Sequence, residues 1–441
     1  MKRIIEAHSH EFDPVTMEAL KKKGFEKVFL MHKDAAFIEK SVKAHPDFVV
    51  GVGWLPMWEG VRSGLSAIDR FRRAGCSALK ICMSCCPYDD EKMYPIYAKA
   101  QRHNLPVSFH TGWLWVKGAG WLGGKGEIKQ ARSLAMWYHP MTLDRITTDF
   151  PGLKLLMNHM GHPWVKEGAC MVNAHTNIYA DLCINSAFTW DPDYFWHEIG
   201  GEATGYNVLF KTMFGSDAFS QGSLDHLAKI ETLFDALAVP PAIRKRAFYG
   251  NALEFIGAAA DEKKSVEVSG VPVKAGGLTD LNVKRFGEPA KARTECLISV
   301  SSSGFNFKFE CFDRSAAKAV IASEGVPEQI WQDDCVEIIL APDSKNYLHF
   351  SLNPKGQAGV DKNRFSPVKF TGKASGSIKA GKWSGELFIP FQMFGGRPKT
   401  GDTWGFNMMR SKKTSPAENS VWNETVQTLH NRDGFGKLIF K

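Results

Sequence analysis

The sequence of 441 residues predicts an α/β domain, a (β/α)8 TIM barrel, followed by an all-β domain, a C-terminal β-sandwich. Through the first part of the chain, short and almost entirely apolar segments alternate with amphipathic stretches of helical spacing. Several of the apolar segments end in histidine or aspartate where the chain turns polar or glycine-rich. Beyond residue 261 the pattern changes to short alternating runs divided by turn residues, which is typical of an antiparallel β domain.

The barrel prediction depends on eight strand-like segments. Short apolar strands that alternate with helices indicate a parallel sheet covered on the outside, and eight such units in roughly 250 residues indicate a closed barrel. The segments are 3–8, 27–32, 48–56, 77–82, 106–110, 153–159, 177–182 and 208–217. We therefore predict a barrel over residues 1–261.

The remainder of the chain is divided into a linker and a second domain. Residues 262–277 are charged and interrupted by glycine and proline without a helical period, so we expect a linker there. Seven or more short strand-like runs follow, among them CVEIILAP, YLHFSLNP, GELFIPF and GKLIF. They predict a β-sandwich over residues 278–441.

The strand ends of the barrel carry candidate metal ligands. His8 and His10 are two positions apart, so a strand would present both imidazoles on one side. His110, His159 and Asp217 end three further apolar segments. Because the functional groups of such barrels come from the carboxyl ends of the strands, the sequence predicts that these side chains meet around one divalent metal ion.

Composition excludes several classes of partner. The formal net charge is +8, but the basic residues are spread out, without a dense block or an arginine and aromatic pattern, so we expect no nucleic-acid partner. No apolar run has the length of a signal peptide core or a membrane span, which predicts a cytoplasmic protein without a membrane partner. The nine cysteines lack the paired spacing of a zinc–thiolate site and are expected to be reduced.

The motifs of the barrel resemble the amidohydrolase superfamily, in the branch of aminocarboxymuconate-semialdehyde decarboxylase, resorcylate decarboxylases and several lactonases. They are HSH, FHTG, NHMGHP, GSD and FYGNALEFIG. The resemblance implies that one divalent metal, zinc or else manganese, is held by His8, His10, His110 and Asp217. It also implies that His159 and Asp217 are the catalytic groups. Glu6 departs from the family, which usually has aspartate there.

Two positions leave alternatives open. His159 is a candidate for hydrogen bonding the nucleophile or polarising a substrate oxygen, and the alternative is a fourth histidine ligand. Lys80 lies near the end of the fourth strand, where other branches carry a carboxylated lysine between two metals. We prefer one metal and a role for Lys80 in anion binding or packing, but a two-metal site stays open.

The glycine-rich stretch after the fifth strand is a candidate lid. Trp113 and Trp115 could form a platform for a ring-shaped substrate, and Lys117 could bind its carboxylate or oxyanion. Trp121 and Lys125 belong to the same stretch. Packing of the tryptophans against the barrel is the alternative.

The order of motifs in the β domain resembles the family 9 carbohydrate-binding modules. The motifs run from WQDDCVEIILAPD through YLHFSLNPKG and GDTWGFNMMR to SVWNE. The family holds sugar between two tryptophans, which the resemblance places at Trp331 and Trp422, whereas Trp383 and Trp404 are expected in the core. The alternative is a structural appendage without a sugar ligand, and we lean slightly towards it.

Three functions follow from these observations. The first is a metal-dependent hydrolase that cleaves an ester, lactone or amide of a small, perhaps carbohydrate-derived ring compound. The second is a non-oxidative decarboxylase, and the third is a glycan-binding protein with an idle barrel. We expect a small-molecule substrate, a carbohydrate as a further candidate ligand, and a homo-oligomer.

Overall fold

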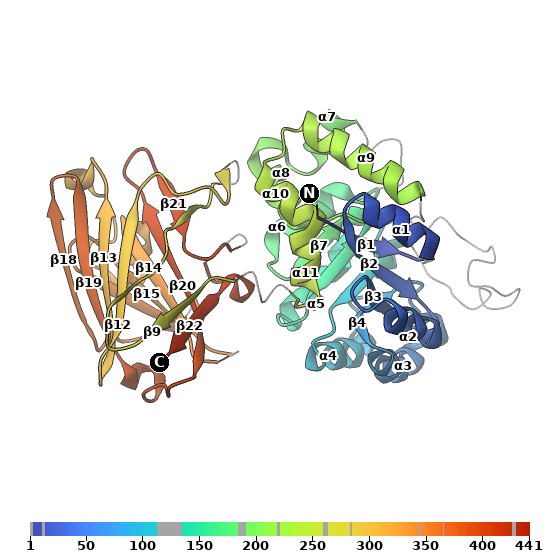
Figure 1. The fold of residues 1–441 in the computed structure, drawn as a ribbon, viewed down its shortest axis with the longest axis horizontal. Coiled ribbons are helices and arrows are strands. Elements are labelled where there is room, and N and C mark those ends of the chain that lie inside the picture. The colour runs from blue at the N-terminus through green and yellow to red at the C-terminus, as the bar shows by residue number, and fades with distance from the viewer. Residues whose placement is uncertain are drawn as a thin grey trace, which may run out of the picture. The chain divides into compact units, whose positions relative to one another are not determined.

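The computed structural model describes residues 3–10, 14–112, 135–183, 191–217, 221–258, 263–282, 285–343, 345–364, 366–425 and 429–441. The chain divides into two compact units, Met1–Ala260 and Asp261–Lys441 (Figure 1). None of the described helices is long and apolar enough to span a membrane.

The first unit is a barrel built on a parallel sheet whose strands follow one another in chain order. The strands are β1 (Ile4–Ser9), β2 (Phe25–His32), β3 (Val49–Trp54), β4 (Cys76–Ile81), β5 (Val107–His110), β6 (Leu155–Asn158), β7 (Ile178–Asp181) and β8 (Thr212–Met213). Backbone hydrogen bonds join the last strand region to the first: Ala7 N donates to Phe214 O and Asp217 N donates to His8 O, each at 2.9 Å. The predicted (β/α)8 architecture is confirmed.

Helices surround these strands (Figure 1). They are α1 (Pro14–Lys22), α2 (Ala35–Ala44), α3 (Val61–Arg73), α4 (Tyr94–Arg102), α5 (Leu143–Asp149), α6 (Val165–Ala174), α7 (Pro192–Glu198), α8 (Gly201–Leu209), α9 (Gln221–Ala236), α10 (Pro241–Lys245) and α11 (Asn251–Phe255). In α3 the buried residues Gly64, Ala67, Ile68 and Phe71 recur at helical spacing, so one face packs inward while its arginines stay at the surface. Every residue of β1 and β3 is buried, as expected for strands covered on both faces.

The second unit is a sandwich of two sheets. One sheet has the order β10 (Val273–Lys274), β12 (Thr294–Val300), β13 (Gly304–Phe312), β19 (Lys382–Pro390) and β18 (Lys373–Lys379). The other has the order β11 (Thr279–Asp280), β21 (Glu418–Val421), β20 (Thr403–Lys412), β14 (Cys335–Ala341), β15 (Leu348–Leu352), β16 (Ala358–Lys362) and β17 (Ser366–Pro367). The strands β22 (Gly436–Phe440) and β9 (Ser265–Val268) extend this second sheet from β20.

The expected linker over residues 262–277 is wrong in its described part. β9 pairs in parallel with β22, and β10 pairs antiparallel with β12. In β9 the buried Val266 and Val268 alternate with exposed Ser265 and Glu267. This period-two pattern is short and flanked by charges, glycine and proline, which concealed it in the sequence.

The core of the sandwich is aromatic. The ring centroids of Phe305, from one sheet, and Trp404, from the other, lie 5.6 Å apart. Trp383 and Trp404 are 1% and 7% exposed, so the expectation that both are core residues agrees with their burial. Packing of this kind leaves the outer face of the second sheet available for polar side chains.

Candidate metal centre of the barrel and polar pocket of the sandwich

The ends of β1 and β8 bring three of the predicted ligands together. The ring centroids of His8 and His10 lie 5.2 Å apart, as their spacing on an extended strand suggested. Asp217 Oδ1 lies 3.1 Å from His10 Nε2 and 3.5 Å from His8 Nε2. One candidate ligand atom from each of the three side chains lies within 4.8 Å of the others, a separation that suits ligands of one metal ion.

Backbone hydrogen bonds to β1 hold Asp217 in place where the last strand of the barrel meets the first. Its amide donates to His8 O, and the preceding amide of Ser216 donates to Glu6 Oε1 at 2.9 Å. Glu6 Oε1 also accepts the amide of His8 at 2.9 Å, so this buried carboxyl links the two ligand-bearing segments. Burial raises the pKa of Glu6 to about 8. For Asp217, burial opposes the shift, but the neighbouring His8 and His10 hold the pKa well below its usual range.

Backbone carbonyls orient two of the imidazoles. His10 Nδ1 lies 3.2 Å from Met31 O, and His159 Nδ1 lies 2.9 Å from Cys183 O. Because a carbonyl oxygen only accepts, we assign the ring proton to Nδ1 in both histidines. Nε2 then carries the lone pair that a metal ligand or a general base requires.

Asp181, the last residue of β7, orients His8. Its Oδ2 lies 2.9 Å from His8 Nδ1, which leaves His8 Nε2 for a ligand. The carboxylate also accepts from Asn158 Nδ2 at 2.5 Å and from His159 N at 2.6 Å. Burial and the charge of Lys80 lower the pKa of His8 to about 4, so this imidazole is neutral at pH 7, the form that binds metal.

The sequence interpretation missed Asp181 although its signal was present. The segment NIYADL is an apolar strand that ends in aspartate, the same feature that drew attention to Asp217. The structure also brings His8, His159, Asp181 and Cys183 within 4.8 Å of one another through single atoms. His159 therefore lies close enough to be either an acid–base group beside the metal or a ligand.

His110 lies beside His159 and belongs to neither of these two groups. Its Nδ1 is 3.2 Å from His159 Nε2, which fits donation by His110 to the lone pair assigned above. Its Nε2 is buried and has no hydrogen-bond partner among the described residues. Burial, reinforced by His159, lowers the pKa of His110 well below its usual value, so it is a neutral base. A buried, unpartnered imidazole nitrogen fits a metal ligand.

Lys80 is buried near His8 and His110. It is 1% exposed, and its Nζ donates to Asn158 Oδ1. Because Asn158 in turn donates to Asp181, a chain of hydrogen bonds runs from Lys80 to His8. Burial lowers the pKa of Lys80. This arrangement stabilises the orientation of the imidazoles.

The predicted substrate-binding residues Trp113, Trp115 and Lys117, together with Trp121 and Lys125, lie outside the described residues. A different aromatic residue lies at the site. Trp54, the last residue of β3, has its ring 5.5 Å from that of His10 and packs edge-on against Trp58 at 6.3 Å. Its position at a strand end was visible in FVVGVGWLP, but tryptophan was not considered there.

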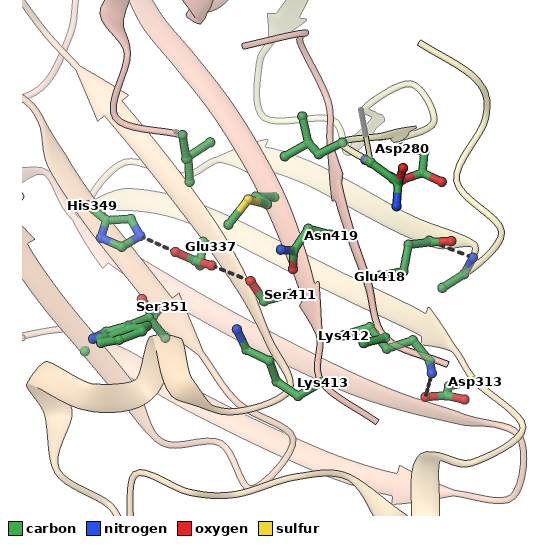
Figure 2. A pocket seen from close by; sticks show the side chains of 18 of the residues that line it. Asp280, Asp313, Glu337, His349, Ser351, Ser411, Lys412, Lys413, Glu418 and Asn419 are labelled. Atoms are coloured by element: carbon green, nitrogen blue, oxygen red, sulfur yellow. Dashed lines mark hydrogen bonds and ion pairs between the residues drawn. The ribbon is translucent and has the colours of Figure 1, made fainter. Parts of the chain in front are cut away.

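A second candidate site is a pocket of about 1620 Å³ on the outer face of the β14 sheet (Figure 2). Side chains alternate along these strands: Ile338 and Phe350 point into the sandwich core, whereas Glu337, His349 and Ser351 line the pocket. These three polar residues are 4–5% exposed although they lie on the outward face. Buried polar groups that line a cavity are typical of a binding site.

The floor of this pocket is a chain of hydrogen bonds. His349 lies between two carboxylates, with Nε2 2.9 Å from Glu337 Oε2 and Nδ1 2.7 Å from Asp361 Oδ2. Glu337 Oε1 also accepts from Ser411 Oγ at 2.9 Å. Burial opposes it, but the two carboxylates raise the pKa of His349 to about 9. At pH 7 the floor therefore contains an imidazolium between two acids.

The two tryptophans expected to clamp a sugar lie in different environments. Trp331 lines the pocket and is 54% exposed. Trp422 is 2% exposed and packs in the core, with its ring centroid 4.9 Å from that of Phe406. An indole enclosed by apolar side chains has no free face for a sugar. The assignment of Trp422 to the sugar site is therefore wrong, and Trp331 is the exposed member of the pair.

The barrel and its strand-end histidines define a TIM barrel with a candidate metal site. Residues 9–258 match the model of the amidohydrolase family, Amidohydro_2, and the chain belongs to this family. No curated protein matches the sequence.

Solved structures resemble each unit separately. An uncharacterised TIM-barrel protein from Bordetella bronchiseptica is 18% identical, with 58% of this chain and 99% of that chain covered and a TM-score of 0.44. The 2,6-dihydroxybenzoate decarboxylase from Rhizobium is 12% identical, with 58% of this chain and 99% of that chain covered and a TM-score of 0.41. A family 9 carbohydrate-binding module from Caldicellulosiruptor kristjanssonii, in complex with cellotriose, is 15% identical over 40% of this chain and 94% of that chain, with a TM-score of 0.32. The amidohydrolase family that the barrel motifs suggested is confirmed, and a separate β unit follows the barrel as predicted.

Proposed function

We propose that this protein is a metal-dependent hydrolase that cleaves an ester, lactone or amide bond of a small ring compound. The observation that carries the proposal is the convergence of unprotonated Nε2 atoms from His8 and His10 on Asp217, with a further one on His159 next to His110. Such a set of imidazoles and one carboxylate suits a divalent metal and leaves an additional base beside it.

The proposed ligands are His8, His10, His110 and Asp217, and zinc suits their nitrogen and oxygen atoms. Two features support the fit: the orphaned Nε2 of His110 and the neutral state of His8. When bound, the metal would lower the pKa of a water to about 7 and so supply a nucleophile at neutral pH.

Three residues have the remaining roles of proton acceptor, orienting group and substrate contact. His159 Nε2 would accept the proton of the attacking water in exchange for its hydrogen bond from His110 Nδ1, while its own Nδ1 stays hydrogen-bonded to Cys183 O. Asp181 keeps His8 in the tautomer that leaves Nε2 free. Trp54 offers an aromatic surface beside His10 against which a ring could lie.

The test is an assay of the full chain with and without metal. Chelator-treated and zinc-reconstituted protein would be given aryl esters, aromatic and sugar lactones, anilides and carboxylated phenols. We expect proton release from one of the first three classes, lost with chelator and restored by zinc. Carbon dioxide release without hydrolysis would reject the hydrolase in favour of the decarboxylase. A metal-loaded protein inert towards all classes would favour an idle barrel.

We also propose that the sandwich pocket binds a carbohydrate. The exposed indole of Trp331 at a cavity with buried hydrogen-bonding groups supports this function over a purely structural appendage. Titration of the full chain with mono- and oligosaccharides, with Trp331→Ala beside the wild type, tests it. Saturable binding that the substitution weakens is expected, and the absence of binding to any sugar would favour the appendage.

A further inference from the structure

Two successive lysines at the end of β20 have different surroundings. Lys412 is 5% exposed, and its Nζ donates to Thr414 O at 2.6 Å and Pro416 O at 2.8 Å and lies 3.5 Å from Asp313 Oδ2. Lys413 is half-buried and extends the opposite way, towards Glu337 and Ser351 (Figure 2). One lysine is therefore a structural cation, and its neighbour is directed into the pocket.

The backbone of Lys413 is held by a buried carboxylate. Asp334 is 2% exposed, and its Oδ1 accepts the amide of Lys413 at 2.9 Å. Its Oδ2 accepts from Thr414 Oγ1 at 2.5 Å and from Val320 N at 2.6 Å. These contacts fix the backbone of Lys413 at the pocket wall, so its side chain extends from a defined position.

The carboxylates on the floor and walls of the pocket already have partners. Glu337 and Asp361 flank His349 at 2.9 and 2.7 Å. Asp280 forms an ion pair with Arg285 at 2.8 Å, and Asp313 lies beside Lys412.

The two remaining carboxylates do not balance Lys413 either. Glu418 accepts two backbone amides at 2.9 and 3.0 Å. Glu328 is exposed on the η12 helix (Pro327–Gln332). Among the described residues, no carboxylate lies within ion-pair distance of Lys413 Nζ. Lys413 therefore contributes to the pocket a positive charge that has no ion-pair partner among the described residues.

Trp331 supplies the second recognition element. Its Nε1 donates to Glu328 O at 3.1 Å, which fixes the indole on the η12 helix. Because Trp422 is buried, a ring bound here stacks on one side only, and stacking alone provides limited affinity. A charged contact with Lys413 would add affinity and select among sugars.

We propose that the sandwich pocket recognises an anionic sugar, a pyranose whose ring stacks on Trp331 and whose carboxylate pairs with Lys413. This inference rests on the proposed carbohydrate function of the sandwich. The cavity of about 1620 Å³ exceeds the roughly 300–1,000 Å³ of common ligand pockets, so an acidic oligosaccharide also fits. A uronic acid carries both the pyranose ring and the carboxylate in one sugar unit.

The test measures binding of D-glucuronate, D-glucose and D-glucose 6-phosphate to the full chain by calorimetry. A charge-assisted contact predicts that glucuronate binds about tenfold more tightly than glucose at low salt. The preference should shrink as sodium chloride is raised, because salt screens a half-exposed ion pair. If D-glucose 6-phosphate binds more tightly than D-glucuronate, the pocket still prefers an anionic sugar, but the preferred anionic group is a phosphate and not a carboxylate.

Two variants and a control separate the contributions. Lys413→Gln should remove the preference for glucuronate and leave glucose binding unchanged. Lys379→Gln, which removes an exposed lysine from β18 of the other sheet, should change neither. Trp331→Ala should weaken both sugars, and Trp331→Phe should restore part of the loss.

The outcomes separate this inference from the carbohydrate proposal on which it rests. Equal binding of glucose and glucuronate that Trp331→Ala weakens would overturn the anionic preference and keep the carbohydrate function. A glucuronate preference that survives Lys413→Gln would overturn the assignment of Lys413. No binding of any of the three probes would overturn both proposals.

Discussion

His8 in the barrel and His349 in the sandwich are both buried and both hydrogen-bonded to an aspartate, yet their pKa values move in opposite directions. His8 meets Asp181 through Nδ1 and is also close to the charge of Lys80, and burial lowers its pKa to about 4. His349 meets a carboxylate through each nitrogen, and its pKa rises to about 9. His8 is hydrogen-bonded through Nδ1, with Asp217 3.5 Å from its Nε2, and stays a base that can bind metal. His349 is hydrogen-bonded to a carboxylate through each nitrogen and becomes a structural cation.

The two sites differ in the same way as their histidines. At the strand ends of the barrel, hydrogen bonds at the Nδ1 atoms of the histidines orient the rings and leave the Nε2 lone pairs available for a metal. On the sheet face of the sandwich, the buried charges satisfy one another, and recognition is left to Trp331 and Lys413 at the wall. The first arrangement suits chemistry at a metal, and the second suits binding without chemistry.

Removal of a proposed ligand should have the largest effect. We expect His110→Ala and Asp217→Asn to lower the zinc content of purified protein to about a tenth or less, because each removes one of four ligands. Metal analysis by mass spectrometry measures this, with His197→Gln on the surface of α7 as the control. Full occupancy in both variants would remove His110 and Asp217 from the ligand set, and two metals per chain would make Lys80 a candidate bridge.

His159→Ala should separate chemistry from metal binding. It removes a base and leaves the proposed ligands, so we expect full metal content and a loss of activity of about a hundredfold or more. Activity and metal content are measured on the same preparation. Metal lost in proportion to activity would instead make His159 a ligand.

Asp181→Asn tests whether the orientation of His8 matters. The amide keeps the shape but no longer fixes the Nδ1 proton, so metal affinity should fall roughly 10- to 100-fold. Competition with a zinc chelator measures the dissociation constant. An unchanged affinity would show that the packing of His8 alone determines its orientation, and the contrast between the two histidines would lose its functional meaning.

The raised pKa of His349 makes the stability of the sandwich depend on pH. The folded value of about 9 lies above the unfolded value of about 6.5, so the contribution is fully present below pH 6.5 and is lost as pH rises through 9. We expect the free energy of unfolding of the sandwich to decrease by about 3 kcal/mol across this window.

His349→Gln is the matching variant, and the pH dependence should disappear with it. Denaturant unfolding at pH 6.5 and pH 9.5 gives the two values, with His197→Gln again as the control. A titration of His349 below pH 7 by nuclear magnetic resonance would contradict the ion-pair chain.

The smallest expected effect is that of substituting Trp422, which the structure places in the core and not in the sugar site. Trp422→Phe keeps most of the buried apolar volume and should cost about 1 kcal/mol of stability without changing sugar affinity. Thermal unfolding and sugar calorimetry on one preparation measure both quantities. Weakened sugar binding at unchanged stability would return Trp422 to the binding site.

Much of the barrel site could be predicted because its signals are local. A strand end places histidine, aspartate or lysine at a known edge of the sheet, and the spacing of His8 and His10 is enough to bring their rings together. Asp181 and Trp54 carried the same local signal. Their partners, His8 and His10, are distant in sequence, so nothing local indicated what they would contact.

The sequence by itself determined the two fold classes, because the periods of apolar residues follow from the geometry of helix and strand. It also determined which strand ends carry the candidate ligands. Only the tertiary structure decided that β9 joins the sandwich, that Trp422 is buried while Trp331 is exposed, and that Lys412 and Lys413 have different surroundings. The physical reason is that burial, ion pairing and pKa depend on residues far apart in the chain, whose proximity arises when the sheets pack.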